Sequence, residues 1–269
     1  MGKRIGSELT RRRILATAGT IGTAAIAGCG STTDTKVGKP SEKDVPAPSV
    51  QAGNRWSLQT PDSEPRLIVE GEKAFLNYQA VGHIKRHEDT VLRDRIKEST
   101  FGEVDRPFAA GFCGRIDIFP NRLSFASGLV ADVDERMLSR LKTAMEDFGV
   151  QNVTEEGTQS ATNIPGDLQV VIGDYQIEPV VIEGVDIPHS DRTTLKFGGG
   201  ALPIKGIVAN WKEGGSILAA GGVYPNGPFR QSRQVEMSDA IQLGISIDLD
   251  ISPPEREQQA LDYIRSVSL

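Results

Sequence analysis

The hydrophobic pattern divides the chain into an apolar leader, a polar stretch and a long region of short apolar segments. Residues 14–27 are mostly apolar, and residues 30–65 are rich in Ser, Thr, Pro, Lys, Asp and Glu. From Arg66 onward, short apolar segments alternate with turns that contain Gly, Pro or Asp. Segments bounded in this way are typical of strands. The pattern therefore predicts a folded body that begins near residue 66.

Most of this body is predicted to be strand. Strands are expected at 67–69, 75–80, 108–113, 115–119, 168–172, 176–182, 193–197, 203–211, 216–223 and 241–251. Lys212-Glu213-Gly214-Gly215 predicts a turn, so the segments on either side of it should form a hairpin. The interval 81–99 fits either a short helix or a polar hairpin, and its periodicity does not decide between them.

Two segments show the repeat of an amphipathic helix. In the first, Asp132 to Glu135 predicts an N-terminal cap, the apolar stripe continues to Phe148, and Gly149 ends the helix. The second begins at Ser252-Pro253-Pro254-Glu255, with proline in the first turn and a capping-box pair. Because runs of strands separate the helices, we expect an α+β fold: a mainly antiparallel sheet with two packed helices, one of them C-terminal.

The first 29 residues have the pattern of an export signal. Arg11, Arg12 and Arg13 precede the apolar run, which is shorter than the roughly 20 residues of a membrane span and ends in Ile26-Ala27-Gly28-Cys29. A small-residue cleavage site followed directly by cysteine is typical of a lipid anchor. We therefore expect a twin-arginine signal peptide ending in a lipobox at 1–28, lipidated Cys29 with a disordered tether at 29–65, and a single α+β domain at 66–269.

Charge and cysteine content narrow the classes of partner. Removal of residues 1–28 would take away five of the 30 basic and one of the 36 acidic residues, and the net charge would change from −6 to −10. An acidic surface opposes binding to phosphate backbones, so nucleic acid is not expected as a partner. The second cysteine, Cys113, lies in an apolar segment and is predicted to be an inert core thiol.

Two groups of residues are candidates for chemistry. His83 and His87 are four residues apart, a spacing that places two imidazoles on one face of a helix, but Lys85 and Arg86 lie between them and no third metal ligand is fixed by spacing. Surface histidines are the expected outcome. The second group lies on the predicted hairpin, where glycine inside a strand indicates a close approach by a packed helix or by a ligand. Its members are Trp211, Gly221, Gly222 and Tyr224, and the two aromatic residues are expected in the core.

Parts of the chain resemble known proteins. The leader resembles the twin-arginine signal and lipobox of haloarchaeal surface lipoproteins. The region from about Arg106 to Pro228 resembles a haloarchaeal family catalogued as a domain of unknown function, through Arg106-Pro107-Phe108-Ala109-Ala110, the helix 134–148 with Gly149-Val150-Gln151-Asn152-Val153, Ile207-Val208-Ala209-Asn210-Trp211, and Leu218-Ala219-Ala220-Gly221-Gly222-Val223-Tyr224-Pro225. The resemblance implies a cell-surface location and a small α+β domain. The predicted sheet with a terminal helix is also similar, at the level of fold alone, to the Mog1/PsbP-like fold.

The sequence leads to one preferred hypothesis and two alternatives. We expect a lipoprotein of the cell membrane, facing the extracellular side, whose domain binds a surface protein or a small ligand without catalysis and without a cofactor. Its other partners would be the membrane, through the lipid on Cys29, and the twin-arginine export machinery. The alternatives are a metal-dependent hydrolase that uses His83 and His87 with Glu88 or Asp89, and a small-solute-binding lipoprotein.

Overall fold

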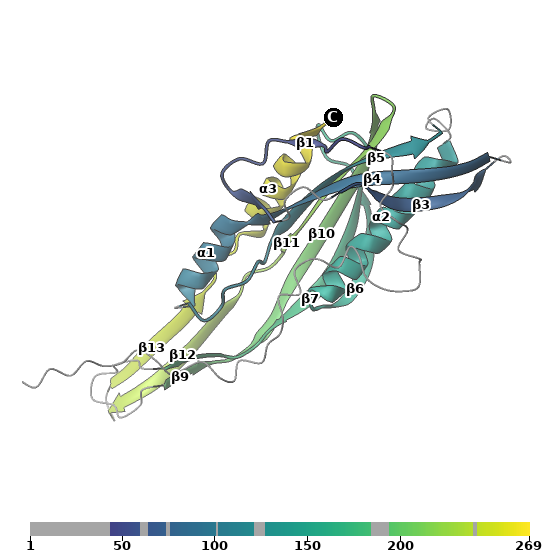
Figure 1. The fold of residues 1–269 in the computed structure, drawn as a ribbon. Coiled ribbons are helices and arrows are strands. Elements are labelled where there is room, and N and C mark those ends of the chain that lie inside the picture. Colours follow the sequence, from purple (N-terminus) through teal and green to yellow (C-terminus); the bar gives the residue numbers. More distant parts are fainter. Residues whose placement is uncertain are drawn as a thin grey trace, which may run out of the picture.

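An antiparallel sheet of eight strands forms the centre of the computed structural model, which describes residues 44–59, 64–73, 76–100, 102–120, 127–183, 194–238 and 241–269 (Figure 1). Its strand order is β2-β4-β5-β11-β10-β7-β6, and β3 also pairs with β4. These strands are β2 (Trp56–Leu58), β3 (Arg66–Lys73), β4 (Leu76–Asp89), β5 (Ala110–Phe119), β6 (Val150–Gln159), β7 (Leu168–Ile177), β10 (Gly200–Glu213) and β11 (Ser216–Pro225).

Three helices and three two-stranded sheets complete the described structure. The helices are α1 (Thr90–Ser99), α2 (Ser127–Asp147) and α3 (Pro253–Arg265). The small sheets pair β1 (Ser49–Val50) with β14 (Val267–Ser268), β8 (Val180–Glu183) with β9 (Thr194–Phe197), and β12 (Arg230–Ser238) with β13 (Ile241–Asp248). The prediction of a mainly antiparallel sheet with a C-terminal helix is therefore confirmed, and α1 is a third helix that adds to the two expected ones.

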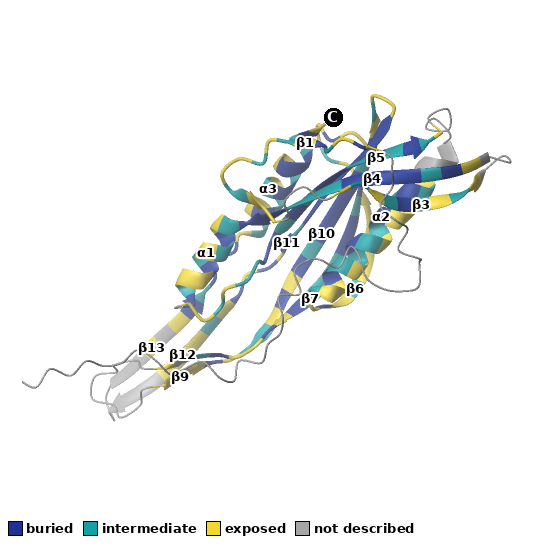
Figure 2. Cartoon of the chain, viewed as in Figure 1, coloured by how far each residue is buried: buried dark blue, intermediate teal, exposed yellow. Residues whose placement is uncertain are grey.

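The helices α2 and α3 pack on opposite faces of the sheet. A Cβ atom on Gly206 would lie 2.8 Å from the Met145 sulfur of α2, whereas one on Gly222 would lie 3.3 Å from Cβ of Ala260 in α3. Gly206 pairs with Val223 across the hairpin, and neighbouring residues of a strand face opposite sides. The glycines thus let one helix approach each face, and the fold has three layers (Figures 1 and 2).

Several local predictions are corrected by the structure. The helix α2 begins at Ser127, so Asp132 lies inside it instead of capping it, and the Asp132 carboxylate accepts a hydrogen bond from the Tyr78 hydroxyl at 3.3 Å. At the start of α3, Ser252 makes no side-chain capping bond, so the predicted capping box is wrong there. The ambiguous interval 81–99 divides into the end of strand β4 and the helix α1.

The described fold includes a segment that precedes the expected boundary by about twenty residues. Val45 is 1% exposed, β1 pairs with β14, and β2 pairs with β4, so residues 44–58 lie against the sheet and α3. The prediction of a disordered tether through residue 65 is therefore wrong for this segment. The prediction failed because composition measures only how much apolar surface a segment carries. It does not indicate whether the few apolar residues of the segment pack against a sheet formed by the rest of the chain.

Two hairpins continue beyond one end of the main sheet. Strands β9, β12 and β13 extend side by side away from the helices in Figure 1, and β8 pairs with β9. Nη1 of Arg233 on β12 donates to the Lys196 carbonyl on β9 at 2.6 Å. Burial is densest at the centre of the main sheet, where β11 is almost entirely buried and β10 is buried in its middle, from Gly206 to Ala209 (Figure 2). None of the helices in the described ranges has the length and apolar character needed to cross a membrane.

Candidate functional site

The most deeply buried charges of the described structure meet where β4 ends and α1 begins. Asp89 and Arg256 are each 1% exposed, although they are far apart in the sequence. One carboxylate oxygen of Asp89 caps α1 by accepting from the Leu92 amide at 2.9 Å, and the other accepts from Nε of Arg55 at 2.7 Å. Nη1 of Arg256 lies 3.8 Å from that second oxygen. Asp89 therefore serves both as a helix cap and as the counterion of two guanidinium groups.

Arg256 is held without full hydrogen bonding. Its Nη2 donates to the carboxylate of Glu255, while its Nε and Nη1 have no hydrogen-bond acceptor among the described residues. Burial and the nearby charge of Arg55 lower the pKa of Arg256. The buried ion pairs thus depend strongly on Asp89 as their shared anion.

The segment 44–58 covers one face of β4 and is held there by contacts to its polar residues. Nδ1 of His83 is 3.1 Å from the Val45 carbonyl oxygen, and Nζ of Lys85 donates to the Pro48 carbonyl at 3.2 Å. Further along, the Arg55–Asp89 ion pair and the β2–β4 pairing fix the end of the segment. The segment is therefore positioned by residues of the sheet, and it forms one wall of a pocket whose other wall is α3.

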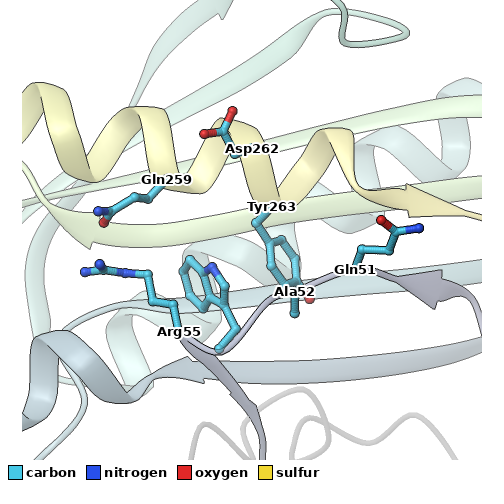
Figure 3. Close-up of a pocket in the computed structure, with 7 residues that line it drawn as sticks. Gln51, Ala52, Arg55, Gln259, Asp262 and Tyr263 are labelled. Atoms are coloured by element: carbon cyan, nitrogen blue, oxygen red, sulfur yellow. The ribbon is translucent and has the colours of Figure 1, made fainter.

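This pocket has a volume of about 210 Å³ and lies between the two walls. The segment contributes Gln51, Ala52, Arg55 and Trp56, and one face of α3 contributes Gln259, Asp262 and Tyr263. The rings of Trp56 and Tyr263 meet at a centroid distance of 5.1 Å and an angle of 54°. Figure 3 shows the polar ends of Arg55 and Gln259 near each other at one end of the pocket, with Gln51 at the other end.

The two polar groups at this end of the pocket are each oriented by a carboxylate. Asp89 accepts from Nε of Arg55, and Glu255 accepts from Nε2 of Gln259 at 2.8 Å. The remaining atoms, Nη2 of Arg55 and Oε1 of Gln259, are buried and have no hydrogen-bond partner in the described part of the chain. One donor and one acceptor thus lie buried, unpaired within the described structure, on residues that line the pocket, beside its aromatic pair.

His83 and His87 are buried on strand β4, which corrects the expectation of surface histidines, and the helix that the metal-site alternative required is not formed there. The Tyr263 hydroxyl oxygen lies 2.8 Å from Nδ1 of His87, and burial, with a smaller contribution from Lys85, lowers the pKa of His87. The acids proposed as further ligands bind arginines instead, Asp89 with Arg55 and Glu88 with Nη1 of Arg93 at 3.0 Å. Within the described residues, no three His, Cys, Asp or Glu side chains cluster as a metal site would require.

The candidates on the β10–β11 hairpin take part in packing. Gly222 faces Ala260 of α3, and a Cβ atom on Gly221 would lie 2.4 Å from both the Ile207 carbonyl oxygen and the Phe112 ring. Trp211 and Tyr224 are buried, and the Trp211 indole donates to Glu213 at 3.2 Å. The close approach indicated by the glycines is therefore made by a helix and by a neighbouring aromatic ring.

The remaining residues named in the sequence analysis are the two cysteines and the three arginines of the leader. Cys113 is buried on β5, and burial raises the pKa of its thiol to about 11, so it stays protonated at neutral pH. Arg11, Arg12, Arg13 and Cys29 lie outside the described residues.

Neither the residues that line the pocket nor the buried ion pair beside it was identified from the sequence. Two signals pointed to the ion pair. Asp89 directly precedes a segment of helical periodicity, as a capping residue does, and Arg256 occupies a position on the buried stripe of α3 that also holds Ala260 and Tyr263. A charged residue on an apolar stripe indicates a buried ion pair, but the sequence does not show which acid supplies the partner.

Comparison with known proteins gives one match. The sequence profile of a family described as a domain of unknown function (DUF6517) matches residues 45–268. This range includes the segment 45–58, in agreement with its packing against the sheet. No curated protein sequence and no solved structure matches the chain.

Proposed function

The chain belongs to the DUF6517 family, a domain of unknown function, and from that premise we propose that it is an exported, lipid-anchored protein of the cell surface whose domain binds without catalysis. In this proposal the lipid on Cys29 holds the protein to the membrane on the extracellular side. The domain then presents the pocket between the segment 51–56 and α3 to a small ligand or to a surface protein.

The pocket is the observation that carries the binding role. It combines a fixed donor, a fixed acceptor and two aromatic rings, which are the features of a site that orients a ligand. Its polar side chains are held by ion pairs and hydrogen bonds, and burial raises the pKa of the Tyr263 hydroxyl, which keeps it neutral. A neutral phenol and a guanidinium bound to a carboxylate suit binding better than proton transfer near pH 7.

The leader supports export and anchoring. Three consecutive arginines before a short apolar run, followed by Ile26-Ala27-Gly28-Cys29, are the pattern of twin-arginine export with lipidation. The family match begins at Val45, so about 15 residues separate the matched region from Cys29. We also propose a haloarchaeal origin, on the resemblance of the leader and the body, and a Mog1/PsbP-like relationship on architecture alone, from which no function follows.

Export by the twin-arginine route is tested by changing Arg11 and Arg12 to Lys together. Lysine retains the charge but not the guanidinium group that defines the motif, so the uncleaved precursor is expected to accumulate inside the cell. Immunoblots of cell fractions would measure this, with Arg4→Lys as a control that leaves the arginine triplet intact. Unchanged export of the double variant would contradict the proposed route.

Anchoring is tested separately with Cys29→Ser. A serine hydroxyl does not carry the thioether-linked lipid, so the variant should be exported and released into the medium instead of remaining with the membrane. Cys113→Ser provides the matched control, because the buried Cys113 should leave membrane attachment unchanged. Retention of the Cys29→Ser protein in the membrane fraction would count against lipidation at this residue.

A further inference from the structure

We propose that the pocket between the segment 51–56 and α3 binds an amide group, as carried by a peptide or by an amide-bearing small molecule. This inference rests on the proposed binding function and assigns it a chemical class of ligand. The proposal depends on three features of the pocket: the pair of oriented polar atoms, the charge balance around them, and the size and aromatic lining of the cavity.

The oriented atoms form a complementary pair for an amide. Nη2 of Arg55 is a donor and Oε1 of Gln259 is an acceptor, and both are buried without a partner among the described residues. The amide of Gln259 has its orientation set by Glu255, since only its Nε2 atom can donate to that carboxylate. An amide offers a carbonyl oxygen to Arg55 and an N–H to Gln259. A ligand that makes both bonds removes the cost of two buried unsatisfied groups.

The charges around this pair favour a neutral ligand over a free anion. The positive charges of Arg55 and Arg256 are matched by the negative charges of Asp89 and Glu255. The carboxylate of Asp262, which also lines the pocket, is paired with Arg265 at 2.7 Å. A carboxylate or phosphate entering the pocket would therefore meet charges that are already balanced. Such an anion would find no unpaired cation among the described residues of the pocket. Its oxygen atoms would also face the Gln259 oxygen, and two acceptors cannot form a hydrogen bond with each other. A neutral group with one acceptor and one donor fits both conditions.

The size and lining of the cavity limit the ligand to a short one. A volume of about 210 Å³ is below the range of roughly 300–1,000 Å³ that is typical of sites for drug-sized molecules. The rings of Trp56 and Tyr263 offer apolar surface beside the polar pair. One amide with a small apolar substituent therefore fills the site, and its dissociation constant is expected on the order of 1 mM.

The test uses the fluorescence of Trp56, which becomes the only tryptophan of the chain in a Trp211→Phe background. The full mature chain carrying Cys29→Ser is titrated with N-methylacetamide, which has a single amide, and with acetate, inorganic phosphate and glucose as separate probes. We expect a saturable change with the amide in the millimolar range, and at least tenfold weaker binding of the three other probes. Tighter binding of acetate or phosphate would overturn the amide assignment in favour of an anion.

Variants of the pocket locate the binding. Gln259→Met removes the acceptor, and Arg55→Lys keeps a cation beside Asp89 but lacks Nη2, so each should weaken amide binding about tenfold. Gln258→Met is the matched control, because Gln258 is exposed on the same helix and bonds Asp262 outside this pair. Thermal unfolding of each variant verifies folding, and either pocket variant provides the test if the other does not fold.

The outcomes separate this proposal from the proposed function. Equal amide affinity in the folded Gln259→Met and Gln258→Met proteins would place binding elsewhere and overturn the site. The absence of saturation with the amide would overturn the ligand class. In both cases, release of the Cys29→Ser protein from the membrane would still support the surface-anchored protein, whereas retention in the membrane would contradict the anchor whatever the pocket binds.

Discussion

Asp89→Asn is expected to lower the free energy of unfolding by about 3–5 kcal/mol, the usual cost of removing one partner from a buried ion pair. Asparagine keeps the shape of the side chain and still caps the amide of Leu92, so the helix cap is largely retained. What is lost is the negative charge shared by Arg55 and Arg256, and Arg256 is 1% exposed. Urea denaturation followed by tryptophan fluorescence would measure the change.

Asp105→Asn is the matched control for this substitution. Asp105 also accepts from two cations, Nε of Arg93 and Nζ of Lys97, each at 2.6 Å, but its side chain is 37% exposed. Solvent screens these pairs, so the expected loss is below about 1 kcal/mol. If both variants lost the same free energy of unfolding, burial would not make the Asp89 ion pairs stronger than the exposed pairs of Asp105. The role of Asp89 as the shared counterion of two arginines would then be wrong.

The parts of the fold that could be predicted were those with an apolar pattern of their own. The stripe that ends at Phe148 located most of α2, and the turn at residues 212–215 located the β10–β11 hairpin. Strands β6 and β12 were not predicted. Strand β6 lies at the edge of the main sheet and is almost entirely exposed, while the sequence of β12 is mostly polar, so neither has the alternation that identifies a half-buried strand.

The candidate site could not be predicted because its residues meet only through tertiary structure. Arg55 lies in a segment whose composition indicated disorder, Asp89 ends a strand, and Gln259 lies on the last helix. The positions of Asp89 and Arg55 relative to each other depend on the register of β2 with β4, in which Trp56 pairs with Asp89. The register between two strands depends on how the side chains of several strands pack together. The hydrophobic pattern of a single segment therefore does not predict it.

Gly221→Ala is the second substitution with a large expected effect, a loss of about 3 kcal/mol in the free energy of unfolding. The added Cβ would lie 2.4 Å from the Ile207 carbonyl oxygen and from the Phe112 ring, and both distances are shorter than a van der Waals contact. The carbonyl belongs to the paired strand β10, so relief would require a backbone shift in the centre of the sheet. Urea denaturation would again measure the loss.

Gly244→Ala provides the control, because Gly244 is also in a strand, β13, but a Cβ atom there would meet no atom within 4 Å. Alanine restricts the unfolded chain more than glycine does, so this variant should be unchanged or more stable by about 0.5–1 kcal/mol. If Gly221→Ala were equally well tolerated, close packing would not explain the glycine. A ligand lying on β11 would then return as the reason for glycine at this position, and binding studies would have to include that face of the sheet as well as the pocket beside α3.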